Sequence, residues 1–134
     1  MKRAMVYLLL AALLLMSAAV AEPTFQQITQ EEAARILEEE TEYILLDVRT
    51  LEEYDEGHIP GAINLPNETI GEGELPELPD RDQMILVYCR SGRRSKEAAG
   101  KLAALGYTQV LEFGGIMTWT GEVVSTLEEA SAAQ

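Results

Sequence analysis

The chain has 134 residues, 47% of them hydrophobic, which suits one small domain with one core and leaves no room for a second domain. Its formal net charge of −13 argues against nucleic acid and anionic membrane as partners and favours a soluble monomer. Cys89 is the only cysteine, so its thiol cannot form a disulfide within the chain and is either incidental or reactive.

The first 21 residues have the layout of a secretory signal peptide. A basic start, Met1 to Arg3, precedes an uncharged run over 6–16, and Ala19-Val20-Ala21 has the form of an A-x-A cleavage site. An uncleaved anchor is the alternative, but an apolar stretch of about 17 residues is short for crossing a bilayer. We expect cleavage after Ala21 and a periplasmic or secreted protein with no stable membrane association. The domain is then expected over 22–126, followed by a frayed or helical tail over 127–134.

Two capping-box patterns, in which Ser or Thr is followed three residues later by Glu, mark the first expected helices. Thr29 precedes a helix over about 30–40, and Thr50 precedes a short helix that stops at Gly57. The apolar run 43–48 between them suits a strand buried on both faces. Shorter strands are expected at an edge over 25–28 and over 62–65.

In the second half of the chain, turn-forming and acidic residues over 67–82 indicate a solvated loop. The run 83–88 is the most strand-like segment, and Ser95 is expected to cap a helix over 96–105 that Gly106 ends. The remaining expectations are a strand over 108–111, a turn at 113–115 and a helical turn over 116–120. Strands that alternate with helices predict an α/β fold with a mainly parallel sheet.

Cys89 follows the strand 83–88 directly, at the strand end where open α/β sheets place their ligand sites. The tight loop behind it, made flexible by Gly92, can turn several backbone N–H groups toward one point, and the next helix adds its positive end. Arg90, Arg93 and Arg94 add full charges. These features predict a low-pKa thiolate and a site for an anion that reacts with it. The alternative is a buried core cysteine among ordinary solvated arginines.

Three stretches resemble motifs of the rhodanese superfamily. "CRSGRRS" (89–95) is similar to its active-site loop, "LLDVRTLEEYDEGHIPGAINLP" (45–66) to its upstream signature, and "LEFGGIMTW" (111–119) to its closing Gly-Gly…Trp element. The resemblance implies a single rhodanese-like α/β domain with a central, mainly parallel five-stranded sheet and helices on both faces. It also implies sulfurtransferase activity: a sulfane sulfur from thiosulfate or a persulfide donor passes through a persulfide on the cysteine to cyanide, a small thiol or a protein thiol.

The resemblance also implies roles for single residues. Cys89 would be the persulfide-forming nucleophile, and Arg94 would order the loop as much as it touches substrate. Asp47 and Arg49 would shape the neighbourhood of the site, His58 would have a structural role in a turn, and Trp119 would pack in the core. The N–H cradle and part of the anion site would be formed by the loop residues Arg90, Ser91, Gly92, Arg93, Arg94 and Ser95.

The length of the loop separates two activities within the superfamily. The spacing from Cys89 to Arg94 is C-x4-R, whereas related phosphatases and arsenate reductases have C-x5-R, which makes room for a phosphate-sized oxyanion. The sequence therefore favours sulfur transfer over phosphatase activity. A persulfide carrier or partner-binding module with little turnover, and a catalytically silent binding domain, remain alternatives. We expect no cofactor, because no nucleotide or flavin motif occurs, and no metal, because Cys89 and His58 are too few ligands for a closed zinc site.

Overall fold

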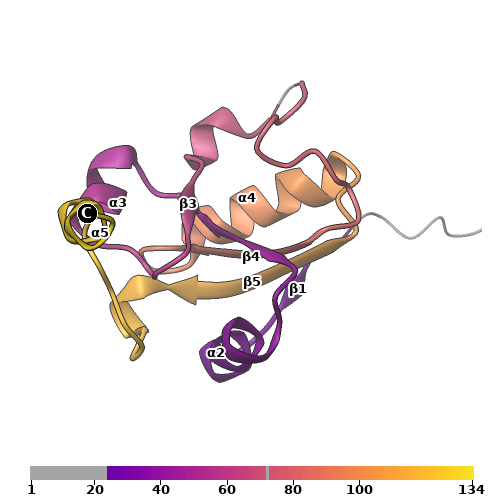
Figure 1. The fold of residues 1–134 in the computed structure, drawn as a ribbon. Helices are drawn as coiled ribbons and strands as arrows, with labels where there is room; N and C mark the ends of the chain where they lie inside the picture. The colour runs from indigo at the N-terminus through magenta and orange to yellow at the C-terminus, as the bar shows by residue number, and fades with distance from the viewer. Residues whose placement is uncertain (1–23, 72) are drawn as a thin grey trace, which may run out of the picture.

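The computed structural model describes residues 24–71 and 73–134. Its centre is a five-stranded sheet, parallel throughout, as Figure 1 shows. In the order of the sheet the strands are β1 (Gln26–Gln27), β5 (Gln109–Gly115), β4 (Met84–Cys89), β2 (Tyr43–Asp47) and β3 (Ile63–Asn64). The predicted α/β fold with a mainly parallel, five-stranded sheet is confirmed.

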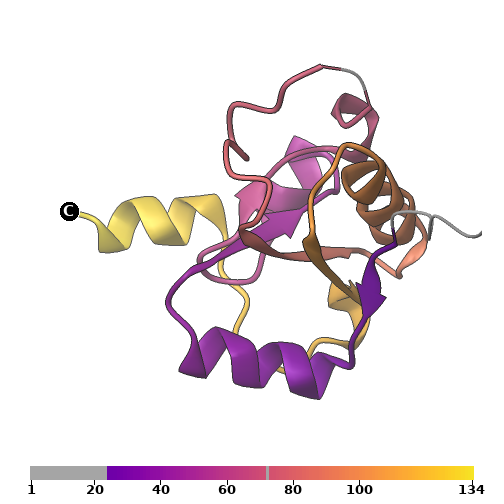
Figure 2. The same ribbon diagram turned by 90° about the vertical axis from the view of Figure 1, so that its right-hand side faces the viewer.

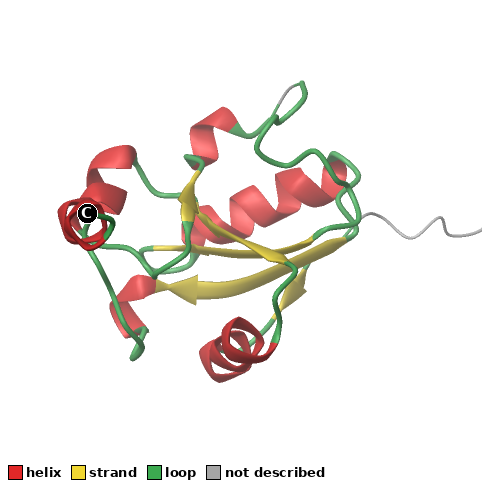
Figure 3. Cartoon of the chain, in the orientation of Figure 1, coloured by secondary structure: helices red, strands yellow, loops and turns green. Residues whose placement is uncertain are grey.

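Helices cover both faces of this sheet. Seen in Figures 1 and 2, α2 and α4 lie on opposite faces, and α3 and α5 lie side by side near one end of the strands. Figure 3 shows the same alternation of helices and strands along the chain. The helices are α2 (Gln30–Glu39), α3 (Leu51–Glu56), α4 (Arg93–Ala104) and α5 (Thr126–Ala132), with 3₁₀ turns η1 (Asn67–Thr69) and η2 (Ile116–Thr118).

The side chains of the central strand β4 point alternately to the two faces of the sheet. Both faces are buried there, so the strand is apolar along its length. Ile85, Val87 and Cys89 belong to the core layer beneath α4, and Leu86 and Tyr88 belong to the layer that contains the buried side of α2. This alternation follows from the two-residue period of a strand. It also places the Cys89 side chain on the α4 side of the sheet.

Both predicted capping boxes are present. The Thr29 hydroxyl accepts a hydrogen bond from the Glu32 N–H at 3.1 Å, and the Glu32 carboxylate accepts one from the Thr29 N–H at 2.9 Å. Thr50 and Glu53 repeat the arrangement at the start of α3, which ends before Gly57 as expected. Each box satisfies backbone donors that the first turn of a helix leaves free.

The expectation of a solvated loop over 67–82 is wrong for part of that segment. Residues 67–69 form η1, and Ile70, Leu75 and Leu78 are buried in the core layer beneath α4. These three apolar residues are spaced irregularly among prolines and carboxylates, so no helix or strand period reveals them. The segment covers the core, and the acidic side chains that the structure describes in it are exposed: Glu68, Glu74, Glu77, Asp80 and Asp82.

The C-terminal residues form the helix α5, which contacts α3: the Thr126 hydroxyl donates a hydrogen bond to the Asp55 carboxylate at 2.7 Å. Just before it, Val124 and His58 exchange backbone hydrogen bonds at 2.8 and 2.9 Å. Over 24–71 and 73–134, no helix has the length and apolar character needed to cross a bilayer. The predicted signal peptide, residues 1–21, lies outside the described residues and stays a prediction.

Candidate active site

Cys89 is the last residue of β4 and is 1% exposed. Its Sγ lies 3.0 Å from the backbone N of Gly92, which donates a hydrogen bond to it, and 3.3 Å from the Ser95 hydroxyl oxygen. The position at the carboxyl end of a central parallel strand is the one expected for a ligand site in this class of sheet. The sulfur is therefore in contact with the loop and with the first turn of α4.

The helix behind the loop begins earlier than the sequence indicates. It starts at Arg93 with Gly92 as its N-cap residue, and Ser95, the expected cap, lies inside the first turn. Gly92 has φ +114°, a left-handed conformation that only glycine adopts without strain, so the chain turns into the helix at once. Among the residues that the structure describes, no side chain caps α4. The N–H groups of its first turn consequently remain available to the sulfur.

These contacts act on the thiol in opposite directions. Burial by itself raises the pKa of Cys89, because the charged thiolate is less well solvated. The hydrogen bond that the Cys89 sulfur shares with the Ser95 hydroxyl, together with those from the backbone N–H groups of Ser95, Gly92 and Ser91, outweighs burial, and the pKa of the thiol falls below its ordinary value. The loop thus stabilises a buried thiolate with neutral donors.

The three arginines of the loop occupy different environments. Arg94 is half-buried and donates to both oxygens of Glu53, at 2.7 and 2.9 Å, which ties α4 to α3. Arg93 is exposed and pairs with Glu97 one turn along α4, at 2.9 Å. Arg90 is exposed and lines a hollow beside the loop. Of the three, only Arg90 is both free of a carboxylate partner among the described residues and next to that hollow.

That hollow has a volume of about 580 Å³. It brings residues of the upstream signature together with the Cys89 loop and η2; its lining residues are Arg49, Glu53, Glu56, Gly57, Arg90, Ile116 and Met117. A larger hollow of about 700 Å³ lies between α3 and α5, but no residue of the Cys89 loop lines it. The smaller hollow is therefore the better candidate for the approach of an anion to the site.

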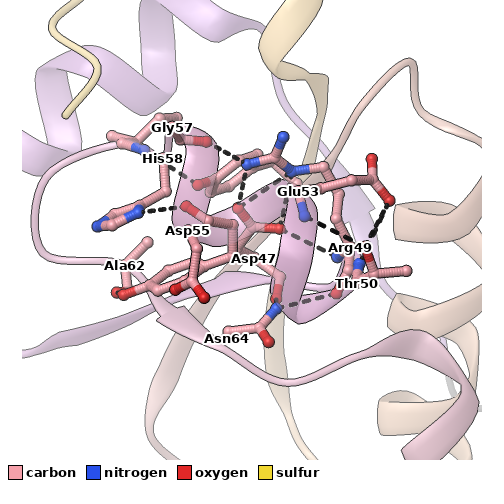
Figure 4. A network of polar contacts seen from close by, with 12 residues as sticks. Asp47, Arg49, Thr50, Glu53, Asp55, Gly57, His58, Ala62 and Asn64 are labelled. Atoms are coloured by element: carbon pink, nitrogen blue, oxygen red, sulfur yellow. Dashed lines mark hydrogen bonds and ion pairs between the residues drawn. The ribbon is translucent and has the colours of Figure 1, made fainter. Parts of the chain in front are cut away.

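Asp47 and Arg49 form a buried pair at the end of β2, drawn in Figure 4. Arg49 Nη2 lies 2.6 Å from Asp47 Oδ2 and also 2.6 Å from the Gly57 carbonyl oxygen, which accepts from it. Burial lowers the pKa of Arg49, but the hydrogen bond and charge of Asp47 outweigh this and raise it, so the guanidinium stays charged. The pair joins β2 to the end of α3, and a role of Asp47 and Arg49 in shaping the site stays a prediction.

His58 lies in a turn, is fully buried and does not contact Cys89. Its ring stacks on Tyr54 with centroids 3.8 Å apart, and Nδ1 lies 2.7 Å from the Tyr54 carbonyl oxygen (Figure 4). Nε2 lies 2.9 Å from a carboxylate oxygen of Glu129 on α5, although the contact is not aligned as a hydrogen bond. These contacts place His58 between Tyr54 and α5, and the structural role expected for it stays a prediction.

Sequence reasoning missed three parts of the site. It noted Glu53 as a capping residue but not as the partner of Arg94. It placed residues 113–115 in a turn, whereas they end β5, and a Cβ built on Gly115 would lie 1.9 Å from the Arg90 carbonyl oxygen. It did not single out Glu112, which is buried on β5 with Oε1 2.7 Å from the Ser95 hydroxyl. The only signal for Glu112 was one acidic residue within an apolar strand.

Comparisons with known proteins agree on one family. Residues 29–122 match the family described as Rhodanese-like domain. Thiosulfate sulfurtransferase PspE of Escherichia coli (strain K12) is 39% identical over 71 residues, which cover 53% of this chain and 68% of that protein. A protein named Sulfurtransferase from Allochromatium vinosum is 37% identical over 94 residues, 69% of this chain and 86% of that protein. A solved structure described as rhodanese with anions from E. coli has a TM-score of 0.57 at 35% identity and covers 62% of this chain and 98% of that chain.

Proposed function

Because the chain belongs to the rhodanese-like domain family, we propose that it is a sulfurtransferase that carries a sulfane sulfur on Cys89. The observation that supports this most directly is the cradle around the thiol. A buried sulfur receives the Gly92 N–H at 3.0 Å and has its pKa lowered by neutral donors. Such a thiolate attacks sulfur directly, and His58 does not contact Cys89.

The proposed reaction has two half-reactions. In the first, the Cys89 thiolate attacks the outer sulfur of thiosulfate, a bond forms between Sγ and that sulfur, and the sulfur–sulfur bond of the donor breaks with its electron pair leaving on sulfite. In the second, cyanide or a thiolate attacks the outer sulfur of the persulfide, and Cys89 leaves as a thiolate. A covalent intermediate of this kind predicts ping-pong kinetics.

Thiosulfate as donor is supported by the name of the E. coli relative and by the charges beside the loop. Arg90, without a carboxylate partner among the described residues, and the Arg49 guanidinium line the hollow together. An anionic donor approaching that hollow meets both. The C-x4-R spacing, with Arg94 turned to Glu53, favours a sulfur atom over a phosphate group within the loop.

The test of this proposal is the formation of thiocyanate from thiosulfate and cyanide. The wild-type chain is expected to turn over with parallel double-reciprocal plots, and Cys89→Ser to have no activity above background. Arg93→Ala serves as the comparison, because this exposed arginine is paired with Glu97 and is expected to matter far less than Arg90→Ala. A Cys89→Ser variant that still forms thiocyanate would rule the proposal out.

One observation favours a second candidate, sulfur carriage to a protein acceptor with little turnover of small donors. Met117 lies in the lining of the hollow and is 65% exposed, and an apolar side chain at the mouth of a site suits a protein surface better than a small anion. Persulfide-loaded protein that passes sulfur to a protein thiol much faster than it turns over thiosulfate with cyanide would favour this candidate.

We also propose that the chain is exported and acts in the periplasm or outside the cell. The support is the sequence of residues 1–21 alone. Expression of the full chain in a bacterium followed by fractionation is expected to yield a protein that begins at Glu22 in the exported fraction. A full-length chain that begins at Met1 and stays in the cytosol would contradict it.

A further inference from the structure

Glu112 is a buried titratable side chain that the sulfur-transfer steps above do not use. It is 2% exposed, on the strand next to Cys89, and its Oε1 accepts hydrogen bonds from the Ser95 hydroxyl at 2.7 Å and from the Gly114 N–H at 2.8 Å. The other oxygen, Oε2, lies 3.4 Å from the side-chain nitrogen of Gln27 on β1. Over 24–71 and 73–134, no lysine or arginine forms an ion pair with it.

The Ser95 hydroxyl lies between this carboxylate and the reactive sulfur. Its oxygen is 2.7 Å from Glu112 Oε1 and 3.3 Å from Cys89 Sγ, and Ser95 is fully buried. A hydroxyl has one proton to donate and two lone pairs to accept with. When the proton points to Glu112, the oxygen is left to accept from the Cys89 thiol. When Glu112 itself holds a proton and donates it, the hydroxyl proton is free to point to a Cys89 thiolate.

Two negative charges in this position are unfavourable, since the groups are buried and no cation is paired with the carboxylate. The charged group that faces Cys89 from α4 is Arg94, and its guanidinium is engaged by Glu53. Two like charges this close in a buried site repel each other, so an arrangement that holds one negative charge is favoured over one that holds two. The Ser95 hydroxyl contacts both groups and can pass a proton from one to the other.

We propose that Glu112 is a positioning residue that stores the Cys89 proton, through Ser95, while sulfur is bound. This inference rests on the proposed sulfur transfer. On loading, the S–H bond of Cys89 breaks, its proton passes to the Ser95 oxygen, and the Ser95 proton passes to Glu112. The sulfur then becomes an anionic persulfide as sulfite leaves. On unloading, the acceptor takes the outer sulfur, Cys89 leaves as a thiolate, and the proton returns by the same path.

The charges balance at each stage. The resting pair of thiol and carboxylate has one negative charge, and so has the loaded pair of persulfide anion and carboxylic acid. Thiosulfate enters with two negative charges and sulfite leaves with two; cyanide enters with one and thiocyanate leaves with one. No oxidant or reductant is needed beyond the sulfur donor and acceptor. The buried layer around Ser95 therefore never has to hold two negative charges at once.

The first test is difference infrared spectroscopy of the wild-type chain at pH 7 before and after loading with thiosulfate, with intact mass measured on the same samples. A carboxylic-acid C=O band is expected to appear with the added sulfur, to shift when the protein is labelled with ¹³C-glutamate, and to vanish after cyanide. Ser95→Ala is expected to load without the band, and Ser95→Thr to restore it. Wild-type protein that gains the sulfur without the band overturns the inference; protein that gains no sulfur shows instead that the proposed function has failed.

A second test uses the free enzyme and does not depend on sulfur loading. While Cys89 and Glu112 together hold one proton, the fraction of wild-type molecules with a Cys89 thiolate and a protonated Glu112 does not change with pH. As the pH is lowered below the main titration of Cys89, the rate of its alkylation is therefore expected to reach a constant value. Glu112→Gln has no such plateau, and its rate is expected to fall about tenfold with each pH unit. Glu38→Gln, an exposed carboxylate on α2, is the matched control and is expected to retain the plateau. Identical profiles for the wild type and Glu112→Gln would contradict the inference.

Discussion

The guanidinium of Arg94 donates two parallel hydrogen bonds to the carboxylate of Glu53, Nη1 to Oε1 at 2.7 Å and Nη2 to Oε2 at 2.9 Å. The two residues are 41 positions apart in the chain, and the pair joins the first turn of α4, which holds the thiol, to the first turn of α3. A bidentate pair of this kind fixes the relative orientation of the two side chains in addition to pairing their charges. The pair thus fixes α4 against α3, and a role of Arg94 in ordering the loop stays a prediction.

Glu53→Gln is expected to lower the free energy of unfolding by about 1 kcal/mol, since a partly exposed ion pair contributes modestly. The comparison is Glu52→Gln, its exposed neighbour on α3, which removes the same charge without breaking a described contact and should cost less. Urea denaturation at pH 7 measures both. Equal losses for the two variants would mean that the pair with Arg94 does not stabilise the fold.

The Glu53–Arg94 pair also predicts how the free energy of unfolding changes at acidic pH. The hydrogen bond from Arg94 is the largest cause that lowers the pKa of Glu53, to about 2 from 4.5. A lowered pKa in the folded state adds stability that is complete above pH 4.5 and is lost as the pH falls toward 2. The difference in unfolding free energy between the wild type and Glu53→Gln should therefore shrink over that window. A constant difference from pH 5 to pH 2 would contradict this account.

Gly115→Ala is expected to displace the Cys89 loop, because the added Cβ would lie 1.9 Å from the Arg90 carbonyl oxygen and 2.4 Å from the Ser91 nitrogen. A shift of this kind in a positioned nucleophile can cost about a hundredfold in kcat/KM. Gly71→Ala is the control, since its Cβ would meet no atom within 4 Å and its φ is not left-handed. If both variants transfer sulfur at the wild-type rate, the contact of β5 with the loop is not required.

Ser95→Ala is expected to slow the alkylation of Cys89 by iodoacetamide at pH 7. The hydrogen bond between the Ser95 side chain and Cys89 Sγ is among the causes that lower the pKa of the thiol against the effect of burial, so its loss raises that pKa and reduces the thiolate fraction. Ser95→Thr keeps the hydroxyl and should recover most of the rate. A wild-type rate in Ser95→Ala would assign the low pKa to the backbone N–H groups alone.

Glu129→Gln is expected to loosen α5, because Glu129 provides the carboxylate that faces the buried Nε2 of His58 at 2.9 Å. Amide hydrogen exchange in α5 should become about two- to fivefold faster, the range that corresponds to the loss of one weak polar contact. Glu122→Gln, at an exposed position before the helix, is the matched control. Unchanged exchange in Glu129→Gln would mean that Glu129 does not stabilise α5. The helix would then be held by the Thr126–Asp55 hydrogen bond and the Val124–His58 backbone pairing.

The sequence predicted those features that depend on local pattern. Thr29 and Thr50 lie at capping positions three residues before a glutamate, the apolar run before Cys89 has the composition of a buried strand, and both features are present. The resemblance to the rhodanese superfamily is confirmed, and so is the fold that it implied. The place of Cys89 at a strand end followed from the same pattern.

Features that depend on contacts between distant segments were not predicted. The start of α4 at Arg93 depends on the left-handed Gly92, which lets the chain enter the helix without the side-chain cap that Ser95 was expected to supply. The end of β5 at Gly115 depends on its close approach to Arg90. The roles of Glu53 and Glu112 likewise appear only when α3, α4 and β5 are brought together.

The measurement that tests the central claim most directly is the intact mass of the protein after incubation with thiosulfate and again after addition of cyanide. We predict a gain of one sulfur atom, its loss to cyanide as thiocyanate, and no gain in Cys89→Ser. The contradicting result is a folded protein with a free Cys89 that gains no sulfur from thiosulfate, polysulfide or a persulfide donor. A gain in Cys89→Ser equal to that of the wild type would contradict the account as well.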